Sequence, residues 1–272
     1  MRFENPQVRN DVNVSKEHPL KEFSQLLIGL LLIVVIAIIV LSVSVGYVAK
    51  KIPFSYEQKL VGHIESLHVT ESPQQQQLQA LADRLSVEMD LPDDMKIVVH
   101  YSDSDVVNAF ATMGGHVFFF KGLIEKLSSE NALAMVMAHE IAHVKHRHPI
   151  AAMGKGVVLA TLASFVAGAS GSRAGEVLIG ESMTLGVLKF SRDQETQSDL
   201  SAMEAIYSLY GNVQGAEELF AVFSNLSHSR FGDAEIFRSH PLTGKRWERI
   251  RSIAEERGWP TSGLMKPLEF DF

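Results

Sequence analysis

The residues most suggestive of chemistry are His139 and His143, which are separated by three positions and have Glu140 directly after the first. Positions i and i+4 lie on one face of a helix, so both imidazoles can bind one metal ion. Glu140 can reach a metal-bound water without binding the metal. The spacing therefore predicts a zinc site with two histidine ligands and a general base. The alternative, core histidines satisfied by backbone carbonyls, is disfavoured because burying such residues without partners is costly.

The segment that carries this motif is predicted to be a buried helix over residues 130–146. Its first half is apolar on every face, which is typical of a helix inside a core. Ser128 and Ser129 can cap its N-terminus. His146 and His148 follow the motif, and we expect them to face solvent or the C-terminal end of the helix dipole.

A catalytic zinc ion needs a third protein ligand, and this chain has no cysteine to supply it. The position at which metzincins place a third histidine is Pro149. Glu195 and Asp199 share one helix face by their spacing, so Glu195 could bind the metal while Asp199 holds His139 in one tautomer. Arg192, one turn earlier, could orient Glu195. Taken alone, this segment is better explained as an ordinary solvated helix.

Four blocks in a fixed order make the resemblance to a family specific: Asn-Ala-Phe-Ala with Gly-Gly at 108–115, the motif at 139–143, the segment 191–199, and Ser-His-Pro at 239–241. The sequence resembles the HtpX-like and CAAX-protease-related family of membrane-associated zinc metallopeptidases over roughly residues 95–255. The resemblance implies one zinc ion per chain, with Glu195 as third ligand and Asp199 behind the ligands. Ser198 departs from the alanine usual between these two residues.

The resemblance also implies how substrates bind. The segment His116 to Phe120 is similar to the edge strand along which substrates of the family lie extended and pair through their backbone. Such recognition tolerates many sequences, which suits unfolded or membrane-associated protein substrates. The candidate substrate-binding residues are Gly114, Gly115, His116, Val117 and Phe118.

The expected activity is zinc-dependent hydrolysis of peptide bonds, in which Glu140 moves the proton. His240 is a candidate oxyanion donor or a movable shield on the zinc ion, although a histidine that merely precedes Pro241 at a helix start explains it equally well. The rival interpretation is a non-hydrolytic metal-stabilised membrane chaperone or scaffold, which the presence of Glu140 disfavours. A second rival is an enzyme held latent by residues 149–190.

Residues 23–49 carry no charge and predict a transmembrane helix. The polar segment before this run and the length of the run favour a retained single-pass anchor over a cleaved signal peptide. Basic residues are balanced on the two sides of the anchor, so the positive-inside rule leaves the orientation open. The expected location is a bacterial inner membrane, with the periplasmic side favoured for the catalytic body.

The predicted fold class is α+β, a mainly helical metallopeptidase domain with a small β-sheet at residues 96–101 and 116–120. A net charge of −7 excludes nucleic acid as the main partner and leaves protein substrates and membrane lipid. The uncharged part of 149–190 is shorter than a membrane span, so a helical hairpin is favoured there. The expected organisation is a polar tail (1–22), the anchor (23–49), linking helices (50–94), the zinc metallopeptidase domain (95–258) and a C-terminal tail (259–272).

Overall fold

The computed structural model describes residues 19–49, 51–61, 72–154, 156, 190–227, 234–241 and 244–270. The chain divides into two units, Met1–Val43 and Ser44–Phe272, which are treated separately. Most of the helical hairpin expected over 149–190 lies outside the described residues, although residues 148–154 are helical.

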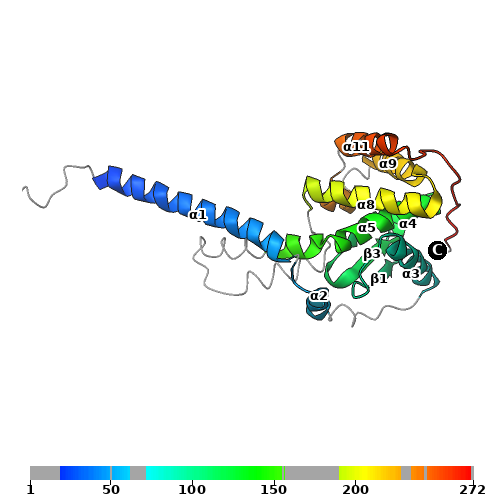
Figure 1. Ribbon diagram of the computed structural model, residues 1–272, viewed down its shortest axis with the longest axis horizontal. Helices are drawn as coiled ribbons and strands as arrows, with labels where there is room; N and C mark the ends of the chain where they lie inside the picture. Colours follow the sequence, from blue (N-terminus) through cyan, green and yellow to red (C-terminus); the bar gives the residue numbers. More distant parts are fainter. Residues whose placement is uncertain are drawn as a thin grey trace, which may run out of the picture. The chain divides into compact units, whose positions relative to one another are not determined.

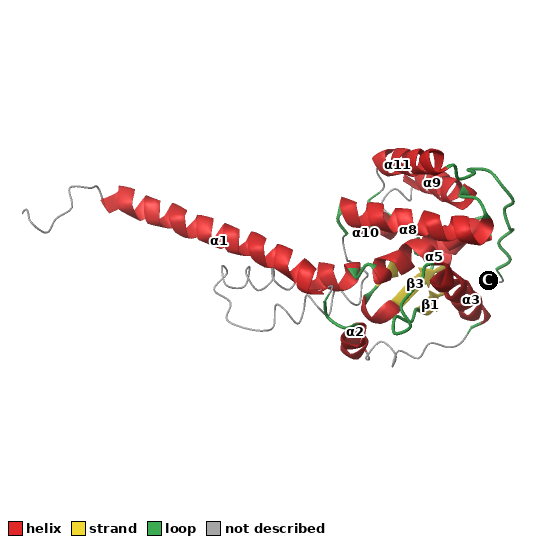
Figure 2. Cartoon of the chain, viewed as in Figure 1, coloured by secondary structure: helices red, strands yellow, loops and turns green. Residues whose placement is uncertain are grey.

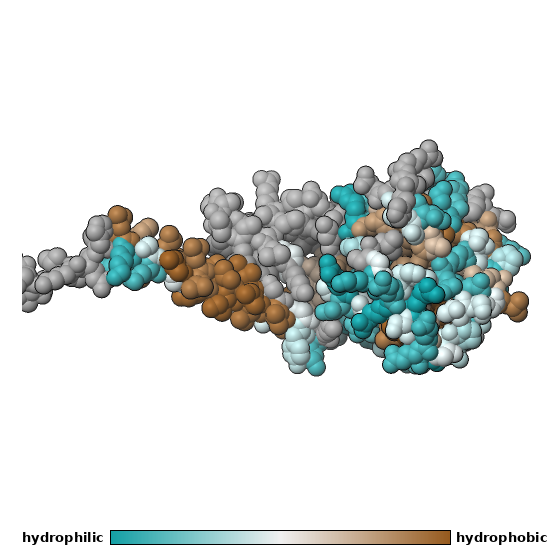
Figure 3. Space-filling model, turned by 90° about the horizontal axis from the view of Figure 1, so that it is seen from above, coloured by the Kyte–Doolittle hydropathy of each residue, from teal (hydrophilic) through white to brown (hydrophobic). Residues whose placement is uncertain are grey.

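The N-terminal helix α1 (Pro19–Ala49) is apolar and exposed along its length. Its mean hydropathy reaches 3.5, and among the described residues it is the one helix long and apolar enough to cross a membrane. Its 31 residues exceed the roughly 20 needed for the hydrocarbon core. Figure 3 shows the brown apolar surface that this helix presents. The predicted apolar helix at the start of the chain is therefore present.

The second unit contains a three-stranded sheet in the order β1-β3-β2, formed by β1 (Val98–Ser102), β2 (Ala109–Ala111) and β3 (His116–Phe120). β1 is parallel to β3, and β2 is antiparallel to it. The turn into β3 is the short helix η1 (Met113–Gly115). Gly115 has a φ of 87°, and a Cβ there would lie 2.0 Å from a backbone oxygen, so only glycine fits this turn.

The prediction that β3 is an edge strand is wrong, because both of its sides are paired. The β-prone composition of β3 predicts a strand but does not indicate which strands pair with it. β2, with three residues, is too short to be predicted from its composition. The outer edge of β1 is covered by the side chain of Gln79, which accepts from Val99 N (2.9 Å) and donates to Ile97 O (3.0 Å). Among the described strands, β2 is left as the edge that could pair with another chain.

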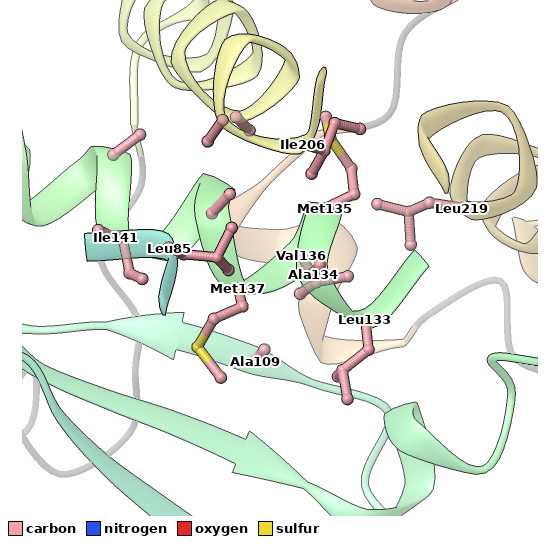
Figure 4. Close-up of a cluster of buried hydrophobic side chains, with 14 of the residues drawn as sticks. Leu85, Ala109, Leu133, Ala134, Met135, Val136, Met137, Ile141, Ile206 and Leu219 are labelled. Carbon is pink, nitrogen blue, oxygen red and sulfur yellow. The ribbon is translucent and has the colours of Figure 1, made fainter. Parts of the chain in front are cut away.

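Helix α5 (Glu130–Lys145) lies at the centre of the domain and is buried from Asn131 to Val144. Ser129 caps it by accepting a hydrogen bond from Ala132 N at 3.1 Å. Figures 1 and 2 show the sheet and α3 on one side of α5 and the helices α8, α9 and α11 on the other. Figure 4 shows why α5 is apolar all round: Met137 points toward the sheet, whereas Met135 points toward Ile206 and Leu219.

The other helices enclose α5 and supply the rest of the core. The most extensive helix contact in the domain is that between α5 and α8. The bounds of these helices are α2 (Phe54–Val61), α3 (Pro73–Glu88), α4 (Lys121–Ile124), α8 (Arg192–Tyr210), α9 (Gln214–Ser227), α10 (Glu235–Ser239) and α11 (Gly244–Arg257).

A second hydrophobic cluster joins the C-terminal end of α1 and helix α2 to the rest of the second unit. It contains Ala49, Val61, Met113, Ile150, Ala151, Met153 and Phe190. Beside it, the buried carboxylate of Glu57 on α2 pairs with Arg147 and accepts a hydrogen bond from Gly114 N. Helix α2 is therefore packed into the domain rather than acting as a free linker.

We expect removal of residues 1–43 to leave a folded, zinc-containing domain, and removal of residues 1–61 to destabilise it. The longer deletion removes Glu57 and leaves Arg147, which is 12% exposed, without its carboxylate. The same deletion removes the buried side chain of Phe54, a loss of about 3–5 kcal/mol, which lowers the melting temperature of a domain of this size by about 6–20 °C. Thermal unfolding of the two zinc-loaded fragments measures the difference. Equal melting temperatures would show that α2 contributes nothing to the fold.

Candidate metal centre

Four buried side chains from three parts of the chain converge on one point. They are His139 and His143 of α5, Glu195 of α8 and His240 directly after α10, and their ligand atoms lie within 4.8 Å of one another. The Nε2 atoms of His139 and His143 are 3.0 Å apart. Glu195 lies 3.4 Å from His143 Nε2 and 3.6 Å from His139 Nε2.

Local sequence signals position each ligand. His139 and His143 share a face of α5 one turn apart, as their spacing predicts. The first turn of α8 is fixed by a capping box in which Ser191 and Gln194 exchange hydrogen bonds. Glu195 lies one residue after this box, so its side chain leaves a rigid first turn and points inward, where it is 2% exposed.

Asp199 and Arg246 stabilise the ligand side chains through hydrogen bonds and ion pairs. Asp199 lies 3.0 Å from His139 Nδ1, so the Nε2 of that histidine faces the cluster. Burial would raise the pKa of Asp199, but the Arg246 guanidinium and His139 outweigh it and lower the pKa. Arg246 of α11 makes two hydrogen bonds to Asp199, at 2.7 and 2.9 Å, and an ion pair with Glu195 at 2.8 Å.

The arginine expected beside Glu195 was Arg192, and the structure differs. Arg192 is exposed at the first residue of α8, and the contact with Glu195 comes from Arg246 instead. Helical spacing places Arg192 one turn from Glu195 in sequence but on the solvent side of the helix. Two buried carboxylates require a buried cation, and this requirement is the signal that could have directed attention to an arginine elsewhere.

Glu140 lies beside the ligands and not among them. Its carboxylate accepts a hydrogen bond from the backbone amide of Ala111 in β2, and its Oε2 atom has no hydrogen-bond partner among the described residues. Burial raises the pKa of Glu140, against the opposing effect of His240 and His139. A cavity of about 20 Å³, enough for about one water molecule, borders Glu140, His139 and His240.

The donor set and its charge fit a zinc ion. Three buried carboxylates, those of Glu140, Glu195 and Asp199, face one buried guanidinium, Arg246, so a divalent cation would neutralise the cluster. Burial disfavours the imidazolium form of His139, yet Asp199 and Glu195 raise its pKa to about 10, which shows how strongly the site attracts positive charge. Nitrogen and carboxylate oxygen ligands are those of catalytic zinc sites.

His240 belongs to the cluster and is not simply a histidine at a helix start. Its Nδ1 lies 3.0 Å from Glu195 and 3.3 Å from His139 Nε2, and its Nε2 lies 3.4 Å from Glu140. The ring of Phe190 lies against those of His143 and His240, with centroids 3.9 and 5.5 Å apart. His240 therefore has a nitrogen in position to bind the same ion as the other three ligands.

Two expectations about neighbouring residues need correction. His148 does not face solvent: it is 1% exposed and its Nδ1 lies 3.0 Å from His143 Nδ1. The five candidate substrate-binding residues lie in η1 and in the central strand, where His116 bonds His100 at 2.9 Å. The residue of the sheet that contacts Glu140 is instead Ala111 of the edge strand β2.

A mostly helical domain with this ligand set defines the class of zinc metalloendopeptidases. The sequence model of peptidase family M48 matches residues 72–254, and the chain belongs to this family. The cluster of His139, His143, Glu195 and His240 is the zinc-binding cluster typical of the family. The family resemblance and the fold class expected from the sequence are both confirmed.

Several characterised proteins are similar to this chain. The beta-barrel assembly-enhancing protease of Yersinia pestis is 28% identical over 170 residues, 57% of this chain and 34% of that protein. The mitochondrial metalloendopeptidase OMA1 of Schizosaccharomyces pombe is 31% identical over 164 residues, 60% and 47% of the respective chains. Metalloprotease YcaL of Escherichia coli is 27% identical over 158 residues, which are 56% of this chain and 59% of that protein. The chain thus spans less than two thirds of the length of each relative.

Proposed function

We propose that this protein is a membrane-anchored zinc metalloendopeptidase that cleaves unfolded or misassembled proteins. The observation that carries the proposal is the position of Glu140, buried beside the ligand cluster with one carboxylate oxygen that has no hydrogen-bond partner among the described residues. A purely structural metal site has no use for such a group, because an unpaired buried carboxylate oxygen costs free energy.

The residues of this chain support a hydrolytic mechanism. His139, His143 and Glu195 would hold the zinc ion, which when bound acidifies water and polarises the scissile carbonyl. Glu140 would accept a proton from the attacking water and donate it to the leaving amine. Asp199 would keep His139 Nδ1 protonated, and Arg246 would hold the carboxylates of Glu195 and Asp199 in place.

The register of β2 supports substrate binding at this strand in place of β3. Thr112 N bonds His116 O at 2.9 Å and Phe120 N bonds Asn108 O at 3.2 Å, so the even-numbered residues of β2 face β3. Ala109 and Ala111 therefore direct their backbone groups outward. An extended substrate that paired with Ala109 and with the carbonyl of Ala111 would lie beside Glu140, to which the amide of Ala111 donates.

Backbone pairing favours substrates that can become extended, which are unfolded or damaged segments. A role in protein quality control agrees with the name of one relative, a beta-barrel assembly-enhancing protease. Helix α1 would anchor the enzyme in a bacterial inner membrane, with the catalytic domain on the periplasmic side. Membrane-associated proteins are then the substrates nearest to the site.

A latent form of the same enzyme is the second candidate. His240 completes a set of four protein ligands, whereas a catalytic zinc ion keeps one position open for water. Helix α10, which ends directly before His240, also packs on β2, and Ile236 N reaches Val107 O at 3.4 Å. We propose that His240 is a movable shield, and that α10 must shift before a substrate can pair with β2.

The full-length protein, purified in detergent and loaded with zinc, is expected to contain one zinc ion per chain and to digest an unfolded casein-type substrate. A zinc chelator should stop digestion, and added zinc should restore it. Bound zinc without digestion, together with suppressed aggregation of the substrate, would favour the chaperone interpretation. Digestion by His240→Ala but not by the unchanged protein would identify the latent form that His240 shields. Digestion that begins only after a nick within residues 149–190 would identify a form held latent by that segment.

A further inference from the structure

The motif leaves a second group of histidines without an assigned role. His148 is buried, and its Nδ1 lies 3.0 Å from Nδ1 of His143, the ring nitrogen that points away from the ligand cluster. Asp199 occupies the equivalent position behind His139. The Nδ1 atom of His139 thus contacts a carboxylate, whereas the Nδ1 atom of His143 contacts an imidazole.

In the hydrogen bond between His143 and His148, His143 is the donor and His148 is the acceptor. His143 directs Nε2 at His139 Nε2 and at Glu195, so Nε2 is the atom available to a metal and Nδ1 carries the proton. That proton needs an acceptor, because an unpaired buried N–H costs about 1–3 kcal/mol. His148 Nδ1 must therefore be unprotonated, and the proton of His148 must be on Nε2.

The surroundings of His148 accept that proton and extend the chain of hydrogen bonds. His148 Nε2 donates to Gln197 Oε1 at 3.2 Å, and Gln197 Nε2 donates to His146 Nδ1 at 3.2 Å. His146 Nε2 then donates to Ser201 Oγ at 2.8 Å. Each donor in this series has an acceptor when all three imidazoles are neutral. The tautomer of His143 then determines that of His148, and the bonds of Gln197 determine that of His146.

We propose that His148 is a positioning residue that selects the metal-binding tautomer of His143, and that Gln197 on α8 holds the His148 ring in place. This inference rests on the proposed function, since it takes His143 as a zinc ligand. The series also links the helix that carries His143 to the helix that carries Glu195. Partners of this kind typically change metal affinity by about 10–100-fold.

Two variants of equal shape test the acceptor role. His148→Asn keeps an acceptor oxygen where Nδ1 stood, whereas His148→Leu has nearly the same shape as asparagine without any acceptor. Both remove the ring, so both lose similar packing. Zinc dissociation constants measured by chelator competition on the full-length protein are expected to be about 10–100-fold weaker for His148→Leu, and much closer to the unchanged protein for His148→Asn. Equal weakening in the two variants would overturn the proposal.

A surface variant keeps the test informative if both changes at His148 impair folding. Gln197 is exposed on α8, so Gln197→Leu should fold, and it is expected to weaken zinc binding by about tenfold by releasing the His148 ring. Thr196→Ala, its neighbour on the same helix, is the control and should bind zinc normally. Unchanged affinity in Gln197→Leu would reject the role of this series. Failure of the unchanged protein to bind zinc would reject the proposed function instead.

Discussion

Glu140→Gln is expected to retain about one zinc ion per chain and to lose peptide hydrolysis. Glutamine has nearly the same shape and can still contact Ala111, but it cannot accept a proton from water. A general base contributes about 10²–10⁴-fold to the rate, so kcat should fall by at least that range while zinc affinity stays close to that of the unchanged protein. Metal analysis and digestion of an unfolded substrate, made on one preparation, measure both quantities.

Glu204→Gln is the matched control for this variant. Glu204 lies on α8 and pairs with Arg257 at the surface, so the same chemical change there should leave hydrolysis unaltered. Hydrolysis that persisted in a Glu140→Gln preparation free of other proteases would contradict the proposed mechanism.

Glu195→Ala is expected to lose zinc and activity together, whereas Asp199→Ala should weaken zinc binding by only about 10–100-fold and keep some activity in excess zinc. Removing Glu195 deletes a ligand and also one of the two carboxylates that pair with the Arg246 guanidinium, 2.8 Å from it. Removing Asp199 deletes no ligand atom; it removes the partner of His139 Nδ1 and one of the two carboxylates that pair with Arg246.

Chelator competition on both variants separates the two roles. Wild-type-like affinity in Glu195→Ala would show that His139, His143 and His240 hold the ion without it. Combining Glu195→Ala with His240→Ala would then remove zinc binding. An Asp199→Ala variant that lost zinc as completely as Glu195→Ala would contradict the division into ligand and supporting residue.

The part of the site that lies on one helix could be predicted from the sequence. The spacing of His139 and His143 determines their common face once the segment is helical, and the apolar residues before them show that the helix is buried. Glu195 needed the family resemblance, because no local rule relates residues 52 positions apart to one another.

The incorrect predictions all concern relations that only tertiary packing creates. The composition of β3 predicts a strand but not that it has a neighbour on each side. Arg246 reaches Glu195 because α11 packs against α8, which no spacing within either helix reveals. His148 turns inward after a residue with positive φ, Arg147, so the helical register of the motif does not extend to it.

The order in which the metal site is completed along the chain has a consequence for biosynthesis. Its parts come from α5, α8, the residue after α10 and α11, and His139 and His240 are 101 positions apart. A growing polypeptide that has reached Tyr210 carries the histidine motif and Glu195, but it lacks Arg246 to neutralise the paired carboxylates. Until Arg246 has been made, repulsion between Glu195 and Asp199 opposes the catalytic geometry. The complete metal site is therefore expected to form only after α11 has been synthesised.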